Sequence, residues 1–78
     1  MTRAVIKLSG DISPLMPLLS RRIAGCAYHP EVKLMAFRRK NMTVTVDPRR
    51  INLQNVEDEA TAKTFMEWLV SIASRADS

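Results

Sequence analysis

The strongest constraint on the fold is an alternation of apolar and polar residues in the second half of the chain. Met42, Val44 and Val46 alternate with two threonines. A period of two residues is that of a β-strand with one buried face. An Asp-Pro pair at 47–48 then predicts a tight turn, because proline fixes φ and lacks an amide hydrogen. The alternation resumes over residues 51–54, so these two stretches, together with the strand that ends at Phe37, predict three successive strands.

Two stretches predict strands ahead of that turn. Residues 3–8 alternate in the same way, whereas residues 32–37 are apolar on both faces. The apolar residues of the second stretch are Met35 and Phe37 on one face, and Val32, Leu34 and Ala36 on the other. A strand that is apolar on both faces is usually covered on both. We therefore expect a partner, a second copy or the chain's own tail to cover the face that the helices leave free.

A first helix is predicted between these two strands. Ser13 followed by Pro14 is typical of a helix start, because serine caps free amides and proline is pre-set for the first helical position. Pro17 lies one turn further on, so an irregular first turn, with the regular helix beginning near Pro17, is an alternative. Gly25 is the expected C-terminal stop, and residues 26–31 form a connector. The apolar stripe of this helix consists of Leu15, Leu18, Leu19 and Ile23.

A second helix is predicted at the end of the chain. The acidic residues 57–59 place negative charge at the positive end of its dipole. Its apolar stripe consists of Ala62, Phe65, Leu69, Ile72 and Ala73. Met66 and Trp68 flank this stripe, where a lone tryptophan is either a hot spot for a partner or, more often, the edge of the core. We expect residues 1–2 and 75–78 to fray.

The predicted order of elements is β-α-β-β-β-α. Two helices on one face of a four-stranded, mainly antiparallel sheet are the natural packing, so the predicted fold is an α+β two-layer sandwich. The 78 residues suffice for a single domain, residues 1–78. A chain of this size buries only about 60% of the surface that it exposes when unfolded, which leaves little room for a deep active site.

Composition narrows the class of protein. The single cysteine, Cys26, excludes an internal disulfide and cannot supply the four thiolates of an iron–sulfur cluster or a structural zinc site. The sequence has no apolar run near the ~20 residues of a membrane span, and residues 1–10 lack the apolar core of a signal peptide. We therefore expect a cytoplasmic protein without a membrane partner. The formal charge of +4 fits an anionic partner, nucleic acid or solubility alone.

Two basic turns support nucleic-acid binding as an alternative function. The residues that would contact phosphates are Arg38, Arg39, Lys40, Arg49 and Arg50. The two turns lie at opposite ends of one strand, about 17–20 Å apart, so they do not form a single cluster. The sheet face away from the helices, called the open face below, is expected to carry Thr43, Thr45, Asn52 and Gln54. No aromatic residue is expected there, although single strands bind by stacking on aromatic rings.

No constellation of residues indicates catalysis. Cys26 and His29 are three residues apart, but a metal site or a Cys–His nucleophile needs further ligands or an orienting carboxylate. A small buried thiol beside a turn histidine is the simpler interpretation. The acidic run 57–59 matches a helix start as well as it matches acid–base chemistry. Phosphate-binding loops, dinucleotide fingerprints and serine elbows are absent. We expect no enzyme activity, metal or cofactor.

Short motifs spread over residues 11–69 match a known family. The matching pieces are Asp11-Ile12-Ser13 with Pro17 and Leu19, Gly25 with Tyr28 and Pro30, Phe37-Arg38-Arg39, Pro48-Arg49-Arg50-Ile51, and Glu57-Asp58-Glu59 with Ala62 and Glu67-Trp68-Leu69. They resemble an N-terminal accessory domain of iron–sulfur proteins from anaerobic bacteria and archaea. There the domain precedes a four-cysteine module that binds a four-iron, four-sulfur cluster and is related to the cluster domain of the corrinoid iron–sulfur protein.

The resemblance implies a stand-alone accessory domain, because the cluster-binding cysteines would lie beyond Leu69 and this sequence contains none there. It carries over no catalytic residue and no electron-transfer role. The order of elements also resembles one half of the TATA-binding protein, which is an analogy of fold and does not imply DNA binding.

Together these observations predict a non-catalytic interaction module that docks through the open face. The expected partner is a protein, for which the resemblance suggests an iron–sulfur or corrinoid-linked protein, or a second copy of the chain. The residues expected to contact it are Leu34, Ala36, Arg38, Thr43, Thr45, Arg50 and Asn52. Nucleic-acid binding through the two basic turns is the alternative.

Overall fold

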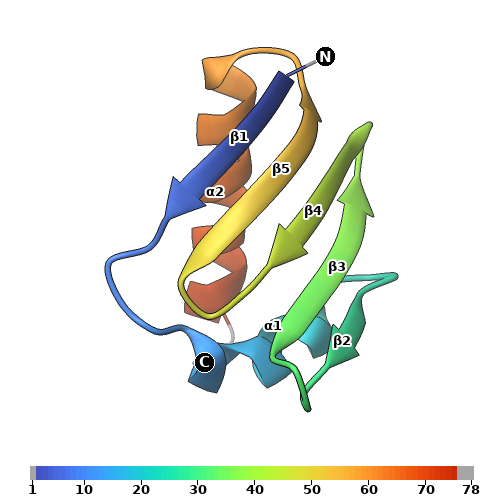
Figure 1. Cartoon of the computed structure of the whole chain (residues 1–78), viewed down its shortest axis with the longest axis vertical. Helices are drawn as coiled ribbons and strands as arrows, with labels where there is room; N and C mark the ends of the chain where they lie inside the picture. Colours follow the sequence, from blue (N-terminus) through green and yellow to red (C-terminus); the bar gives the residue numbers. More distant parts are fainter. Residues whose placement is uncertain (1, 76–78) are drawn as a thin grey trace.

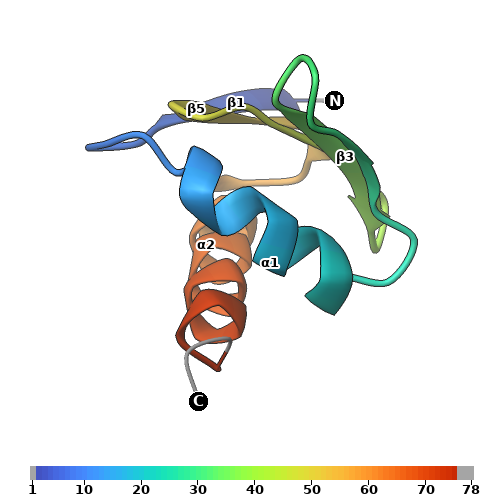
Figure 2. The same ribbon diagram turned by 90° about the horizontal axis from the view of Figure 1, so that it is seen from below.

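The computed structural model describes residues 2–75, which form a curved sheet backed by two helices (Figures 1 and 2). The elements in chain order are β1 (Thr2–Lys7), the 3-10 turn η1 (Ser13–Leu15), α1 (Met16–Arg22), β2 (Ala27–His29), β3 (Leu34–Arg39), β4 (Met42–Val46), β5 (Arg50–Val56) and α2 (Glu59–Arg75). Thr2 and Arg75, which were expected to fray, belong to β1 and α2. The other residues expected to fray, 1 and 76–78, lie outside the described part of the chain.

The strands form one antiparallel sheet in the order β1-β5-β4-β3-β2. Consecutive hairpins place Phe37 opposite Val44 and Val44 opposite Leu53. The first strand, β1, pairs with β5, and Ile6 lies opposite Ile51. Both helices lie on the same face of the sheet (Figure 2). The sheet curves around them, so its other face is convex. The predicted α+β class is therefore confirmed.

The predicted alternation in β4 is also confirmed. Met42, Val44 and Val46 are at most 4% exposed, whereas the two threonines between them are half-buried. This face packs against the helices because burying the apolar side chains removes them from water. The buried core of the described residues consists of Met16, Leu19, Ile23, Met35, Phe37, Met42, Val44, Val46, Ile51, Leu53, Val56, Phe65, Leu69 and Ile72.

The prediction of four strands is wrong, because the described residues form five. Residues 27–29, predicted to be part of a connector, form β2 and pair with β3 through Ala27 and Ala36. A three-residue strand has too short a pattern to be recognised, and its pairing with β3 comes from the tertiary fold. The start of β3 also differs, because Val32 lies in the intervening turn and Lys33 has a φ of 55°. Only Leu34 and Ala36 of the second apolar face therefore lie in the strand.

The irregular start predicted as an alternative for the first helix is the one that the structure adopts. A 3-10 turn precedes α1, and Pro17 falls in the first turn of the regular helix, where proline needs no amide partner. Ser13 does not cap with its side chain; instead its amide donates to Oδ1 of Asp11 at 2.8 Å. The buried stripe also differs from the predicted one, since Met16 is buried and Leu15 is 37% exposed. Gly25, with φ of 71°, follows the helix as predicted.

The second helix begins just after Asp58, which caps it. Oδ1 of Asp58 accepts hydrogen bonds of 2.8 Å from both the hydroxyl and the backbone amide of Thr61. These bonds favour the carboxylate and lower the pKa of Asp58 below its ordinary value of 3.8. The acidic run 57–59 thus has a structural role at this helix start.

We expect the Asp58 cap to contribute less stability in acid. Its pKa is lower in the folded than in the unfolded chain, so its contribution is complete above pH 3.8 and disappears as the pH falls through the lowered value. The Asp58→Ala variant loses the acceptor of both bonds, so it should be destabilised near neutral pH, and its difference from the natural chain should shrink in strong acid. Urea unfolding at a series of pH values measures this difference. A difference that stays constant down to strong acid would contradict the assignment.

Because the helices cover only one face of the sheet, we expect substitutions of two valines on opposite faces to differ greatly in their effect on the free energy of unfolding. Val44 is completely buried under the helices, whereas Val5 is 56% exposed on the opposite face. Val44→Ala should lower the free energy of unfolding by about 2–3 kcal/mol, from two lost methyl groups and the cavity left behind. Val5→Ala, the matched control, should cost about 0.5 kcal/mol or less. Equal losses in urea unfolding would mean that both faces are covered.

Candidate functional site

The open face, away from the helices, is formed by alternate residues of all five strands. Cross-strand pairing arranges its side chains in rows that run across the sheet. The row at one end contains Arg3, Gln54, Thr43 and Arg38. The middle row contains Val5, Asn52, Thr45, Ala36 and Ala27. Towards the other end lie two separate pairs, Lys7 with Arg50 and Leu34 with His29. The structure therefore brings all seven predicted contact residues onto one surface.

Six residues of this surface were not among the predicted contacts. They are Arg3, Val5 and Lys7 of β1, Ala27 and His29 of β2, and Gln54 of β5, which was expected on this face but not as a contact. The alternation of β1 gives the face of its side chains, so this signal was present in the sequence. What the sequence does not give is that β1 pairs with β5 and extends the same surface.

Positive charge lies near the ends of the open face and none lies across its middle row. Arg3 and Arg38 belong to one end, and Lys7 and Arg50 lie near the other. No Asp or Glu occurs in any of the five strands of the described chain. The middle row is uncharged and mostly small. This surface therefore presents an apolar and hydroxyl-bearing strip between two groups of cations.

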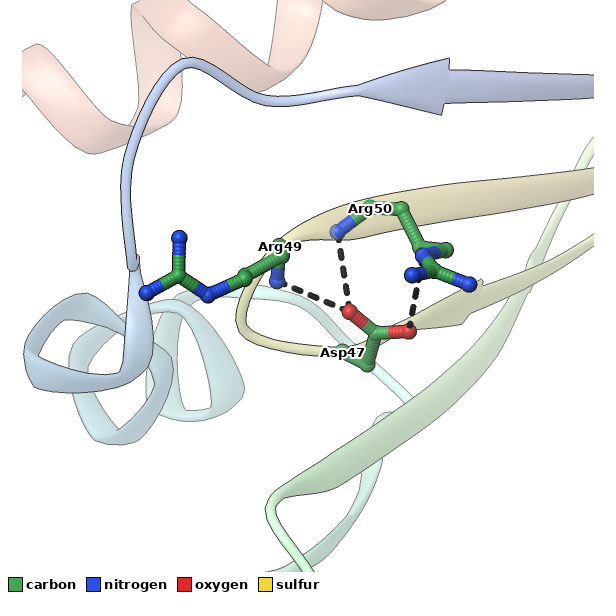
Figure 3. Close-up of polar contacts among 3 residues, drawn as sticks. All are labelled: Asp47, Arg49 and Arg50. Atoms are coloured by element: carbon green, nitrogen blue, oxygen red, sulfur yellow. Dashed lines mark hydrogen bonds and ion pairs between the residues drawn. The ribbon is translucent and has the colours of Figure 1, made fainter.

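The carboxylate of Asp47 organises the turn beside this surface (Figure 3). Its Oδ1 accepts hydrogen bonds of 2.8 Å from the backbone amides of Arg49 and Arg50. Its Oδ2 lies 4.0 Å from Nε of Arg50, and the Asp47 amide donates to the Arg50 carbonyl at 3.0 Å. The aspartate thus fixes the turn through backbone amides and holds one of the open-face cations by its guanidinium.

The five basic residues of the predicted phosphate-binding alternative do not form one site. Of these, Arg38 and Arg50 lie on the open face. Arg39 points to the helix side, where its guanidinium carbon lies 3.8 Å from the centroid of the Trp68 ring. Lys40 and Arg49 lie in turns at opposite ends of β4 (Figure 1). The predicted separation of the two turns is therefore what the structure shows.

The aromatic side chains lie on the helix side of the sheet. Phe37, Phe65 and Trp68 form a cluster with ring centroids 5.7–6.2 Å apart. Tyr28 lies opposite the buried Met35 and packs against the core. No aromatic residue of the described chain belongs to the open face, which agrees with the sequence-based expectation. Trp68 itself is half-buried at the edge of the core.

The Cys26–His29 pair does not form a site with other ligands. Cys26 is half-buried against the core, and this burial raises the pKa of its thiol. His29 is exposed, and its Nδ1 lies 3.7 Å from Oε1 of Glu31. Over residues 2–75, no three His, Cys, Asp or Glu side chains are grouped so that they could hold a metal ion.

Comparisons with models of known protein families, with curated proteins and with solved structures found no match. The resemblance to an accessory domain of iron–sulfur proteins therefore stays a prediction from sequence motifs. No helix in the described part of the chain combines the length and apolarity that crossing a membrane requires.

We expect the side-chain oxygen of Asp47, more than its charge, to stabilise the turn beside the open face. Asp47→Ala removes the acceptor for two backbone amides and should lower the free energy of unfolding by about 1–2 kcal/mol. Asp47→Asn is the matched control, because its amide oxygen can still accept both bonds, and it should cost about 0.5 kcal/mol or less. Urea unfolding compares them. Equal losses would assign the effect to the ion pair with Arg50 instead.

Proposed function

We propose that the protein is a non-catalytic interaction module that docks through its open face onto an acidic surface of a partner protein. The observation that carries the proposal is the composition of this face: cations near both ends, an uncharged strip between them and no carboxylate in any described strand. Charged groups arranged in this way steer association and fix the orientation of the partner. The uncharged strip, with exposed Val5 and Leu34, supplies the apolar contact.

The size of the face favours a transient complex. Five strands spaced by about 4.8 Å, each about five residues long, cover roughly 24 by 17 Å, or about 400 Å². A stable complex of standard size buries about 800 Å² on each partner. The open face alone therefore supports a weak, reversible contact, with charge contributing more to the rate of association and to specificity than to affinity.

The charges of the open face also favour a different protein as the partner over a second copy of the chain. A two-fold dimer presents the same patch from both subunits. Because Arg3 and Arg38 occupy one end of the face and Lys7 and Arg50 lie near the other, any face-to-face pair of copies brings cations against cations. A homodimer through this face is therefore less favourable than a complex with an acidic partner.

Nucleic acid is the second candidate, because the same cations also complement phosphate. Two features of the structure count against it. The open face of the described chain has no aromatic ring on which a base could stack. The face is also convex (Figure 2), so it does not wrap around a duplex. These features support the protein partner as the leading candidate.

The sequence resemblance proposes a class for this partner. Because the resemblance is to an accessory domain of iron–sulfur proteins, the proposed partner is an iron–sulfur or corrinoid-linked protein. The cationic face is compatible with an acidic partner of that kind.

Charge reversal at matched positions tests docking through the open face. In a titration with poly-L-glutamate followed by NMR, amide shifts should concentrate on Ala36, Arg38, Thr45 and Asn52. Arg38→Glu should weaken binding about tenfold, because it places a like charge at the contact. Arg21→Glu makes the same change of net charge at an exposed residue of α1 and should leave affinity within about twofold.

Three outcomes would contradict this proposal. Equal weakening by the two variants would show that binding follows net charge alone. Shifts centred on α1 would place the contact elsewhere. If single-stranded DNA of equal charge displaced poly-L-glutamate and shifted Lys40 and Arg49, the nucleic-acid alternative would replace it.

A further inference from the structure

The outer edge of β1 carries unpaired backbone groups. β1 is the last strand on its side of the sheet, and no other strand of the described chain pairs with its outer side (Figure 1). The amide of Leu8 donates to the Arg49 carbonyl at 2.9 Å and continues the register in which Lys7 lies opposite Arg50. In an antiparallel pair, alternate residues bond to the neighbour. Ala4 and Ile6 therefore bond to β5.

By the same alternation, the amides and carbonyls of Arg3, Val5 and Lys7 point outwards from the sheet. The register is regular over these residues, since the only irregularity of the β1–β5 pair lies between Thr2 and Arg3. Three residues at i, i+2 and i+4 thus offer donors and acceptors in the spacing that an added strand requires. An exposed edge of this kind is a template for strand addition.

The opposite edge of the sheet is less suitable. β2 has only three residues, and Pro30, which lacks an amide hydrogen, follows it directly. His29 there is paired with Glu31. β1 has six residues and no proline. Of the two edges in the described chain, only β1 is long enough to align a partner strand.

The side chains of β1 indicate which strand fits. Arg3, Val5 and Lys7 all lie on the open face, so residues of an added strand directly opposite them lie there too. Opposite charges across from Arg3 and Lys7, and a β-branched residue across from Val5, make favourable cross-strand pairs. Two copies of β1 paired about Val5 would place Arg3 against Lys7, which is unfavourable. Charge complementarity therefore selects a foreign acidic strand over self-pairing.

We propose that the free edge of β1 accepts an extended segment of a partner protein as a sixth strand, with the pattern acidic, any residue, β-branched, any residue, acidic. This inference goes beyond docking on the open face, because it depends on the outward backbone groups of Arg3, Val5 and Lys7, whereas docking depends on side chains across all five strands. Either interaction can fail without the other.

The test uses a capped peptide, Thr-Glu-Thr-Val-Thr-Glu-Thr, added to the full chain and followed by amide hydrogen exchange in NMR. Binding should slow exchange of the outward amides of Arg3, Val5 and Lys7 about tenfold or more, whereas Ala4 and Ile6, already bonded to β5, should change little. The same peptide N-methylated at the residues that face β1 should give no protection. Arg38→Glu, which disturbs the open face, should leave peptide affinity within about twofold.

Two variants of β1 test the contact from the side of the protein. Val5→Pro removes an outward amide without removing a bond to β5, and it should weaken peptide binding about tenfold while thermal unfolding shows that the chain still folds. The double variant Arg3→Glu, Lys7→Glu should reverse the preference, so that a peptide with lysines in place of both glutamates binds better.

Any of three results would overturn the proposal: protection that does not appear at the β1 amides, equal binding by the N-methylated peptide, or a double variant that keeps the preference for glutamate. Peptide-induced shifts confined to β3 and β4 would likewise assign the peptide to the open face and exclude strand addition.

Discussion

The structure depends on the burial of one face of an antiparallel sheet under two amphipathic helices. Val44 and Val46 are completely buried while the threonines that alternate with them remain half-buried, so a single strand shows the two environments side by side. The helices meet this face through Leu19, Phe65 and other members of one core. A chain of this size buries little surface, and its stability rests on this one layer of contact.

One-sided burial also determines where the chain can interact. Because both helices lie on the same face, the other face and the outer edge of β1 stay free in the described chain (Figures 1 and 2). The two surfaces share Arg3, Val5 and Lys7, through side chains in one case and backbone groups in the other. Cations at these positions discourage pairing between copies, a common device at sheet edges. The proposed preference for acidic partners rests on the same charges.

Much of the fold could be predicted because it follows from local periodicity. The sequence correctly predicted the alternation in β4 and β5. It also predicted the apolar stripe of Phe65, Leu69 and Ile72 in α2. The errors fall where local patterns are short or compete. β2 is only three residues long, and a 3-10 turn over Ser13–Leu15 precedes α1. In this region Met16, and not the predicted Leu15, is buried in the core.

The sequence by itself determined which side chains share a face, because alternation and helical spacing are properties of each element alone. It placed all seven predicted contact residues on the open face for this reason. Only the tertiary structure decided which strands are neighbours, because pairing depends on contacts between residues far apart in the chain. That pairing set β1 beside β5, brought Arg3 and Lys7 onto the open face, and left the backbone of Val5 facing outwards at a free edge.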